Sequence, residues 1–218
     1  MSVLTRFAIQ KIIKDGGIVF DPPLDAFQLQ PHAVDLRLGY KFLIPRNWTI
    51  DDRGRRAISI SIDHPEAYQG QFDEVVLKHG QYFELLPNEF VIGTSLEYVE
   101  MNAPNLMALL FPRTSTNRRG IDLSLSGIID AGYKGRLIFP MKNEAGNQVL
   151  RIYPGERVCQ IIFEELSSPL TKEETTQHGV APAKYSGLET NGFKLDKDEE
   201  RQILIKGQIE ELKKRFGI

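Results

Sequence analysis

The chain has 218 residues, of which 41% are hydrophobic and 26% are charged, and its formal net charge is −2. This length can bury a core without disulfides or metals, and the charge gives no whole-chain attraction to nucleic acid or anionic membranes. The single cysteine, Cys159, excludes an internal disulfide, and the four scattered histidines exclude the HxE and PCxxC pattern of zinc deaminases. Without a signal-peptide plan or a membrane-length apolar run, we expect a cytoplasmic protein whose partners include neither nucleic acid nor a membrane.

The first expected element is a short helix within residues 4–14, where apolar side chains recur at helical spacing before Gly16 and Gly17. From Val34 to Glu165, short runs of Val, Ile, Phe and Tyr alternate with turn residues, which is typical of a β-sandwich or barrel. We therefore expect a mainly β, jelly-roll-like fold. The expected strands are Val34–Leu38, Tyr40–Ile44, Ile58–Ile62, Tyr82–Leu86, Phe90–Thr94, Leu106–Phe111, Arg136–Met141, Gln148–Ile152 and Val158–Phe163.

The composition becomes polar after Phe163, which predicts a β domain over residues 1–168 and a C-terminal tail over 169–218. Within this tail, Ile205, Ile209, Leu212 and Phe216 follow a three-four spacing that predicts a helix at about 196–216. This helix either folds back on its own domain or binds a partner, and the pattern alone leaves both open.

Two polar segments within the β region have the composition of an anion-binding site. Residues 111–120 interleave three arginines with hydroxyls and an amide, and arginine forks match phosphate oxygens. Gln160 is a polar amide within an otherwise apolar strand, so it needs a backbone or ligand partner. An exposed, solvated loop remains the alternative for the arginines.

Two further segments combine titratable groups with turn residues. Residues 127–135 contain three glycines, an aspartate that could act as a general base (Asp130) and an aromatic ring that could stack on a ligand (Tyr133). An ordinary Asp/Gly turn with a packing tyrosine is the alternative. Residues 30–39 contain His32, Asp35 and Arg37, and packing or a solvated strand face is equally consistent with these.

Taken in order, these segments resemble the motifs of the dCTP deaminase/dUTPase superfamily from about Leu4 to Tyr185. Residues 30–39 resemble the first motif, residues 112–120 the "GRSSLARLG" and "PRSGLA" motifs, and residues 127–135 the "G-x-IDAGYRG" motif. Residues 154–160 resemble the phosphate-contacting strand that follows, and residues 184–187 resemble the "KYQGQ" tail motif. The resemblance implies a distorted β-barrel of the dUTPase type and a homotrimer with active sites at subunit interfaces.

The resemblance also assigns roles to individual residues. It implies a deoxyribonucleoside triphosphate substrate and Mg²⁺ held mainly by the triphosphate. The sequence gives no certain metal ligand, and Asp35 is the one candidate, through water. Asp130 would activate the attacking water. The implied phosphate-binding residues are Arg113, Thr114, Ser115, Arg118, Gln160 and Lys184, and the implied nucleoside-binding residues are Ser126, Gly127, Ile128 and Tyr133.

Two departures from the deaminase pattern decide the expected reaction. Pro140 occupies the position of the catalytic glutamate of deaminases, and proline cannot transfer a proton. Tyr133 stands where the deaminase branch usually has tryptophan. We therefore expect a dUTP diphosphatase, which forms dUMP and pyrophosphate by positioning and electrostatic effects. A dCTP deaminase with a displaced acid/base such as Glu144 is the first alternative, and a non-catalytic trimer that binds a nucleotide or a partner is the second.

Overall fold

The computed structural model describes residues 2–58, 71–125, 127–178, 181–182 and 199–216. Contacts group the chain into two compact units, residues 1–44 with 74–192 and residues 45–73 with 193–218. The predicted boundary at residue 168 stays a prediction. None of the described helices is long and apolar enough to cross a membrane.

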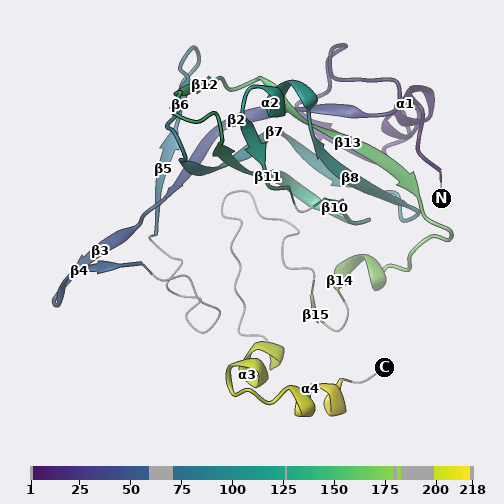
Figure 1. Cartoon of the computed structure of the whole chain (residues 1–218). Coiled ribbons are helices and arrows are strands. Elements are labelled where there is room, and N and C mark those ends of the chain that lie inside the picture. The colour runs from purple at the N-terminus through teal and green to yellow at the C-terminus, as the bar shows by residue number, and fades with distance from the viewer. Residues whose placement is uncertain (1, 59–70, 126, 179–180, 183–198, 217–218) are drawn as a thin grey trace. The chain divides into compact units, whose positions relative to one another are not determined.

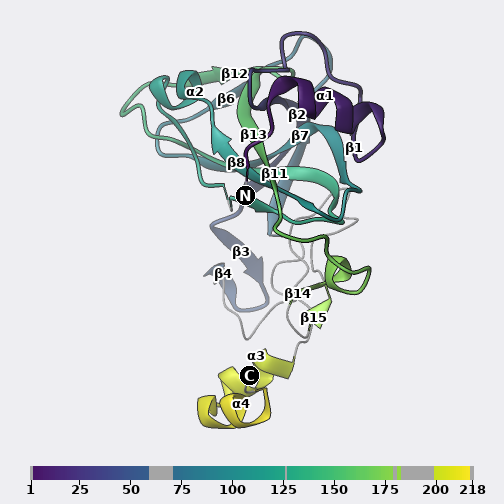
Figure 2. The same cartoon turned by 90° about the vertical axis from the view of Figure 1, so that its right-hand side faces the viewer.

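The first unit is built on one antiparallel sheet (Figure 1; turned by 90° in Figure 2). Among the described residues the sheet has nine strands, seven of them in the order β10-β8-β13-β2-β7-β11-β9, with β1 on β7 and β5 on β2. The bounds of these strands are β1 Ile18–Asp21, β2 Val34–Pro45, β5 Phe72–Val76, β7 Phe90–Met101, β8 Leu106–Pro112, β9 Ile121–Leu123, β10 Ile128–Ile129, β11 Lys134–Asn143 and β13 Arg157–Glu165.

Shorter elements complete both units. They are α1 Arg6–Lys14, β3 Trp48–Asp51, β4 Gly54–Ala57, β6 Phe83–Leu85, α2 Thr114–Arg118, β12 Leu150–Ile152, the 3₁₀ turn Glu174–Thr176, β14 Gln177–His178, β15 Ala181–Pro182, α3 Glu199–Ile205 and α4 Ile209–Arg215. The predicted mainly β, jelly-roll-like fold with short terminal helices is confirmed.

The longest strands bend, and this lets the sheet curl around its core. The pairing of β2 with β7 shifts between Leu38 and Phe42, and the pairing of β11 with β7 shifts between Arg136 and Ile138. Such irregularities increase local twist and bend a strand. The first residues of β2, from Val34 to Arg37, pair with β13, and β1 pairs with the end of β7.

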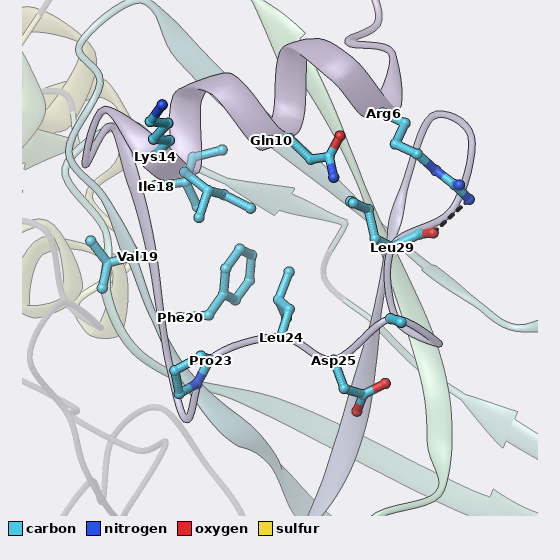
Figure 3. Close-up of a pocket in the computed structure, with 12 residues that line it drawn as sticks. Arg6, Gln10, Lys14, Ile18, Val19, Phe20, Pro23, Leu24, Asp25 and Leu29 are labelled. Carbon is cyan, nitrogen blue, oxygen red and sulfur yellow. Dashed lines mark hydrogen bonds between the residues drawn. The ribbon is translucent and has the colours of Figure 1, made fainter.

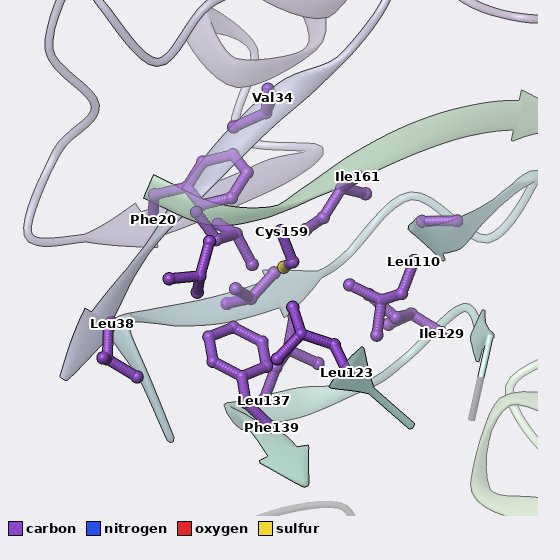
Figure 4. Close-up of a cluster of buried hydrophobic side chains, with 14 of the residues drawn as sticks. Phe20, Val34, Leu38, Leu110, Leu123, Ile129, Leu137, Phe139, Cys159 and Ile161 are labelled. Carbon is purple, nitrogen blue, oxygen red and sulfur yellow. The ribbon is translucent and has the colours of Figure 1, made fainter. Parts of the chain in front are cut away.

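A continuous apolar cluster fills the inside of this curled sheet (Figure 4). Phe42, Phe139 and Phe163 are fully buried, and they come from three different strands of the sheet. Alternate residues along β11 are buried, as expected for a sheet with one face on the core. Cys159 lies in this cluster, so the lone thiol is a core residue.

Two sequence expectations differ from the structure for local reasons. The two strands expected on either side of Gly39 form one strand, β2, and a Cβ at Gly39 would approach the Thr94 oxygens within 3.0 Å. The helix expected at 196–216 is two helices within its described part, because Gly207 adopts a φ of +68° and caps α3. Its N–H and that of Gln208 bond back to Leu204 and Ile203, as in a Schellman motif. Residues 59–62 of another expected strand lie outside the described residues.

Candidate functional site

One pocket gathers most of the predicted phosphate-binding residues. Its volume is about 720 Å³, and it lies between the segment before β2, the end of β8, α2 and β13. The lining residues are Gln30, Pro31, His32, Ala33, Asp35, Arg113, Thr114, Ser115, Arg118, Arg119 and Gln160. We refer to it as the arginine pocket, because its described lining contains three arginines and a single acid.

The α2 helix presents the hydroxyl and guanidinium groups of this pocket. Its N-terminal flank, Arg113, is extended, and Thr116 Oγ1 donates to the Val158 carbonyl at 3.1 Å, which anchors the helix to β13. Gly120 ends the segment at a φ of +85°, where a Cβ would lie 2.6 Å from that of Ala145. Only glycine fits this turn without displacing Ala145. The motif glycine therefore allows the chain to turn directly after α2.

The arginines of the pocket differ in the hydrogen bonds and ion pairs that they make with the protein. Arg118 has no hydrogen-bond or ion-pair partner among the residues that the structure describes, whereas Arg119 pairs with Glu156 and donates to the Arg151 carbonyl. Arg113 donates from Nη1 to the Arg157 carbonyl at 3.0 Å. Arg118 is therefore the guanidinium of this pocket that is most available to an anion, and its role as a phosphate-binding residue stays a prediction.

Asp35 is the single acidic side chain that lines the arginine pocket among the residues that the structure describes, and it is almost fully buried. Its Oδ2 lies 3.1 Å from Arg113 Nε and 3.1 Å from Arg157 Nη1, and it accepts a bond from Gln30 Nε2 at 3.3 Å. Burial raises the pKa of this carboxyl above its ordinary value, although the charges of Arg113 and Arg157 lower it. Its role toward Mg²⁺ stays a prediction.

The predicted water-activating and nucleoside-binding residues lie elsewhere on the chain. Asp130 is exposed directly after β10, and Ile128 is 58% exposed. Neither they nor Gly127 and Tyr133 line the arginine pocket. Since Ile129 pairs with Ala108, Asp130 lies beside the start of β8, whereas Arg113 follows its end, about 20 Å away at about 3.3 Å per residue.

Tyr133 is partly buried against the core, and its hydroxyl donates to the Arg136 carbonyl at 2.9 Å. Burial raises its pKa well above the ordinary value, so the hydroxyl stays protonated. Two other predicted contacts, Ser126 and Lys184, lie outside the described residues. No group of three or more His, Cys, Asp or Glu side chains suited to a metal ion occurs in the described ranges.

Sequence reasoning missed Arg157 and left His32 open. His32 lines the arginine pocket. Arg157 reaches Asp35 because the pairing of β13 with β2 shifts between Arg157 and Cys159, which strand alternation does not reveal. The Pro154-Gly155 turn before Arg157 was the available signal, since it starts the strand that carries Gln160.

A second hollow, of about 690 Å³, is lined by residues of α1, of β1 and of the segment that follows β1 (Figure 3). Phe20, Leu24 and Leu29 give it an apolar lining, and Arg6 closes one end by donating to the Leu29 carbonyl at 2.8 Å. Asp25 also lines this hollow and pairs with Arg37 at 2.7 Å. The hollow shares none of the lining residues of the arginine pocket.

Comparison with known proteins identifies relatives along most of the chain. Residues 3–166 match the family model described as dCTP deaminase-like. A protein of Dictyoglomus thermophilum named "dCTP deaminase, dUMP-forming" is 36% identical over 84% of this chain and 89% of its own length. A protein of the same name from Methanosphaera stadtmanae is 30% identical over 95% of this chain and 99% of its own.

A solved structure supports the same relationship. The crystal structure of 2′-deoxycytidine 5′-triphosphate deaminase from Agrobacterium tumefaciens superposes with a TM-score of 0.57 at 25% identity. The match covers 79% of this chain and half of the length of that one.

These relatives correct the expected reaction: dUTP diphosphatase as the main activity is contradicted. The expectation rested on Pro140 and Tyr133. The Tyr133 hydroxyl donates to the Arg136 carbonyl in the adjacent strand β11, so the side chain reflects local packing and does not identify a reaction. Pro140 removes one proton-transfer group, but an acid/base can be supplied from another position, and one missing group does not fix the chemistry.

Proposed function

The chain belongs to the dCTP deaminase-like family, and from this premise we propose that it converts dCTP to dUMP. The observation that carries the proposal is the arginine pocket, where Arg113, Arg118 and Ser115 gather around a space suited to phosphates. Water would add to C4 of cytosine and ammonia would leave. A second water would attack the α-phosphorus, break its bond to the bridging oxygen and release pyrophosphate.

Asp130 is our candidate for the proton transfers. It would take a proton from water as the oxygen adds to C4, return protons to ring N3 and the departing amine, and then orient the second water. Pro140 cannot share this work. Glu144, the alternative from sequence, pairs with Lys142. Asp130 belongs to the 127–135 segment, which also carries Gly127 and Tyr133, our candidates for contacting the base and the deoxyribose.

We propose that the active site forms between subunits of a homotrimer. The supporting observation is the separation of Asp130 from Arg113 along β8 within one chain, about 20 Å as derived from the strand spacing. In a symmetric ring, the arginine pocket of one subunit can face the Asp130 turn of its neighbour. Ser126 and Lys184 keep their proposed roles toward base and phosphate.

Mg²⁺ fits this site as the counter-ion of the triphosphate. The described residues offer the lone carboxylate of Asp35 in the pocket, which suits a metal that keeps its waters and binds mainly to substrate phosphates. When bound, the ion would neutralise charge on the departing pyrophosphate. The residues that would hold the phosphates themselves are Arg113, Arg118, Thr114, Ser115 and Gln160. An intracellular nucleotide as substrate also supports the expected cytoplasmic location.

The test incubates the purified chain with dCTP and Mg²⁺ and separates the products by chromatography. We expect dUMP, ammonia and pyrophosphate in equal amounts. Asp130→Asn should lower kcat by about 10²–10⁴-fold while dCTP still binds. The control Asp122→Asn removes an exposed carboxyl on β9 and should keep activity. Absence of any uracil nucleotide from dCTP would overturn the proposal.

A further inference from the structure

We propose that Asp35 is a positioning residue that fixes Arg113 so that one edge of its guanidinium meets the triphosphate. This inference rests on the proposed function, since it takes the arginine pocket as a triphosphate site. It assigns a task to the one acid in a pocket that otherwise suits anions.

The geometry of Arg113 supports this assignment. Its Nε faces Asp35 Oδ2 at 3.1 Å and its Nη1 donates to the Arg157 carbonyl at 3.0 Å. Nη2 makes no hydrogen bond within the described part of the chain. Two of the three guanidinium nitrogens are thus held by the protein, and the third is left for a ligand. A planar fork with fixed donors keeps its orientation, which a lysine ammonium cannot do.

Asp35 also connects β13 to the segment of residues 27–33, part of which lines the pocket. Gln30 bonds to both Asp35 Oδ2 and the Phe27 carbonyl, and Arg157 Nη1 contacts the same two acceptors. Residues 30–33, which line the pocket, are thereby linked by hydrogen bonds to the carboxylate that orients Arg113. A buried carboxylate between two guanidiniums is costly to remove singly, because each partner then loses its compensation.

Positioning and simple electrostatics make opposite predictions for Asp35→Asn. The carboxylate repels a triphosphate, so its neutralisation should tighten binding if charge alone matters. If Asp35 orients Arg113, the loss of the ion pair should weaken binding, because the guanidinium must then be ordered by the ligand. The sign of the change therefore separates the two explanations.

The experiment measures binding of inorganic tripolyphosphate to the full chain by calorimetry, in EDTA. We expect Asp35→Asn to weaken binding roughly tenfold, as is common when a group that orients a ligand-binding side chain is lost. Arg113→Lys keeps the charge and should also weaken binding roughly tenfold. The double variant should bind no more than about twofold weaker than Arg113→Lys alone, since the two changes remove one interaction.

The matched control is Asp25→Asn, which removes another carboxylate paired with an arginine from the same segment, but on the apolar hollow. It should keep tripolyphosphate affinity within about twofold, because half-exposed pairs contribute little. Tighter binding in Asp35→Asn, or fully additive effects in the double variant, would overturn the proposal. Weakening seen with Mg²⁺ but absent in EDTA would instead assign Asp35 to the metal and also overturn it.

Two further readouts keep the test independent of folding and of the proposed reaction. If Asp35→Asn does not fold, unchanged affinity in Arg113→Lys would be enough to reject the positioning role. With dCTP as substrate, Asp35→Asn should raise KM while kcat stays nearly constant. If the wild-type chain binds tripolyphosphate but deaminates no dCTP, the proposed function fails while the binding test of Asp35 stands.

Discussion

The buried carboxylate of Glu97 accepts a hydrogen bond from the side-chain amide of Gln28 at 2.7 Å. Its second oxygen accepts the Arg37 backbone N–H at 3.0 Å, and the Gln28 amide also donates to the Asp35 carbonyl. Glu97 therefore joins β7 to the start of β2 and to the segment that forms a wall of the arginine pocket. A charged group in this position links the stability of the fold to pH.

Burial raises the pKa of Glu97 above its ordinary value of 4.5, although its hydrogen bonds lower it. A carboxyl whose pKa is higher in the folded chain takes up a proton on folding, so the free energy of unfolding falls as pH rises from about 4.5 through the folded value. Glu97→Gln removes this dependence. The stability difference between wild type and Glu97→Gln, measured by urea denaturation, should favour the wild type more at pH 5 than at pH 7.5.

Glu100 should show the opposite dependence of stability on pH, because its pKa is lowered in the folded chain. A hydrogen bond from Lys134 lowers the pKa of Glu100, so its contribution to stability is present above about 4.5 and is lost as pH falls below that value. The difference in the free energy of unfolding between wild type and Glu100→Gln should stay constant from pH 7.5 to pH 5 and become smaller in stronger acid. Identical pH profiles for the two variants would contradict the assignment for Glu97.

Arg118 should contribute directly to substrate affinity, because its guanidinium is free of protein partners in the described structure. Arg118→Gln should raise KM for dCTP about tenfold, which corresponds to one charge-assisted contact. Arg56→Gln is the control for net charge. It removes an exposed arginine on β4, which pairs with Asp51 on β3, and should leave KM unchanged. Steady-state kinetics at two salt concentrations tests both, and equal effects of the two variants would show that only total charge matters.

Phe139 should be a major determinant of stability, because its ring is fully buried in the core of the sheet. Phe139→Ala is expected to lower the free energy of unfolding by about 3–5 kcal/mol, through lost burial and a residual cavity. Phe7→Ala removes a ring that is 78% exposed, and it should change the free energy of unfolding by less than about 0.5 kcal/mol. Urea denaturation followed by circular dichroism compares the two.

Cys159 should be inert toward thiol reagents in the native protein. The side chain is fully buried, and burial raises the pKa of the thiol well above its ordinary value, with the nearby Glu97 and Asp35 adding to the shift. Thiol titration should therefore detect no rapid reaction in native buffer and one thiol per chain in denaturant. Rapid native labelling would show that the core opens at β13.

Local signals in the sequence predicted a large part of the fold. Turn residues divide the region from Val34 to Glu165 into short apolar runs, and most of these runs correspond to strands. Very short strands, such as β3, β4 and β9, escaped prediction because three or four residues are too few to show an alternating pattern. The split at Gly207 also went unpredicted, since a helical pattern often tolerates a single glycine.

The sequence by itself determined the β class, the family motifs and the candidate phosphate-binding residues from Arg113 to Arg118, because these depend on residue types at short spacing. Only the tertiary structure decided which charges meet. Asp35 and Arg157 lie 122 residues apart, and a shift in strand register brings them together. The tertiary structure likewise placed Asp130 and Arg113 at opposite ends of β8. Strand pairing and register arise from long-range packing, which no local pattern encodes.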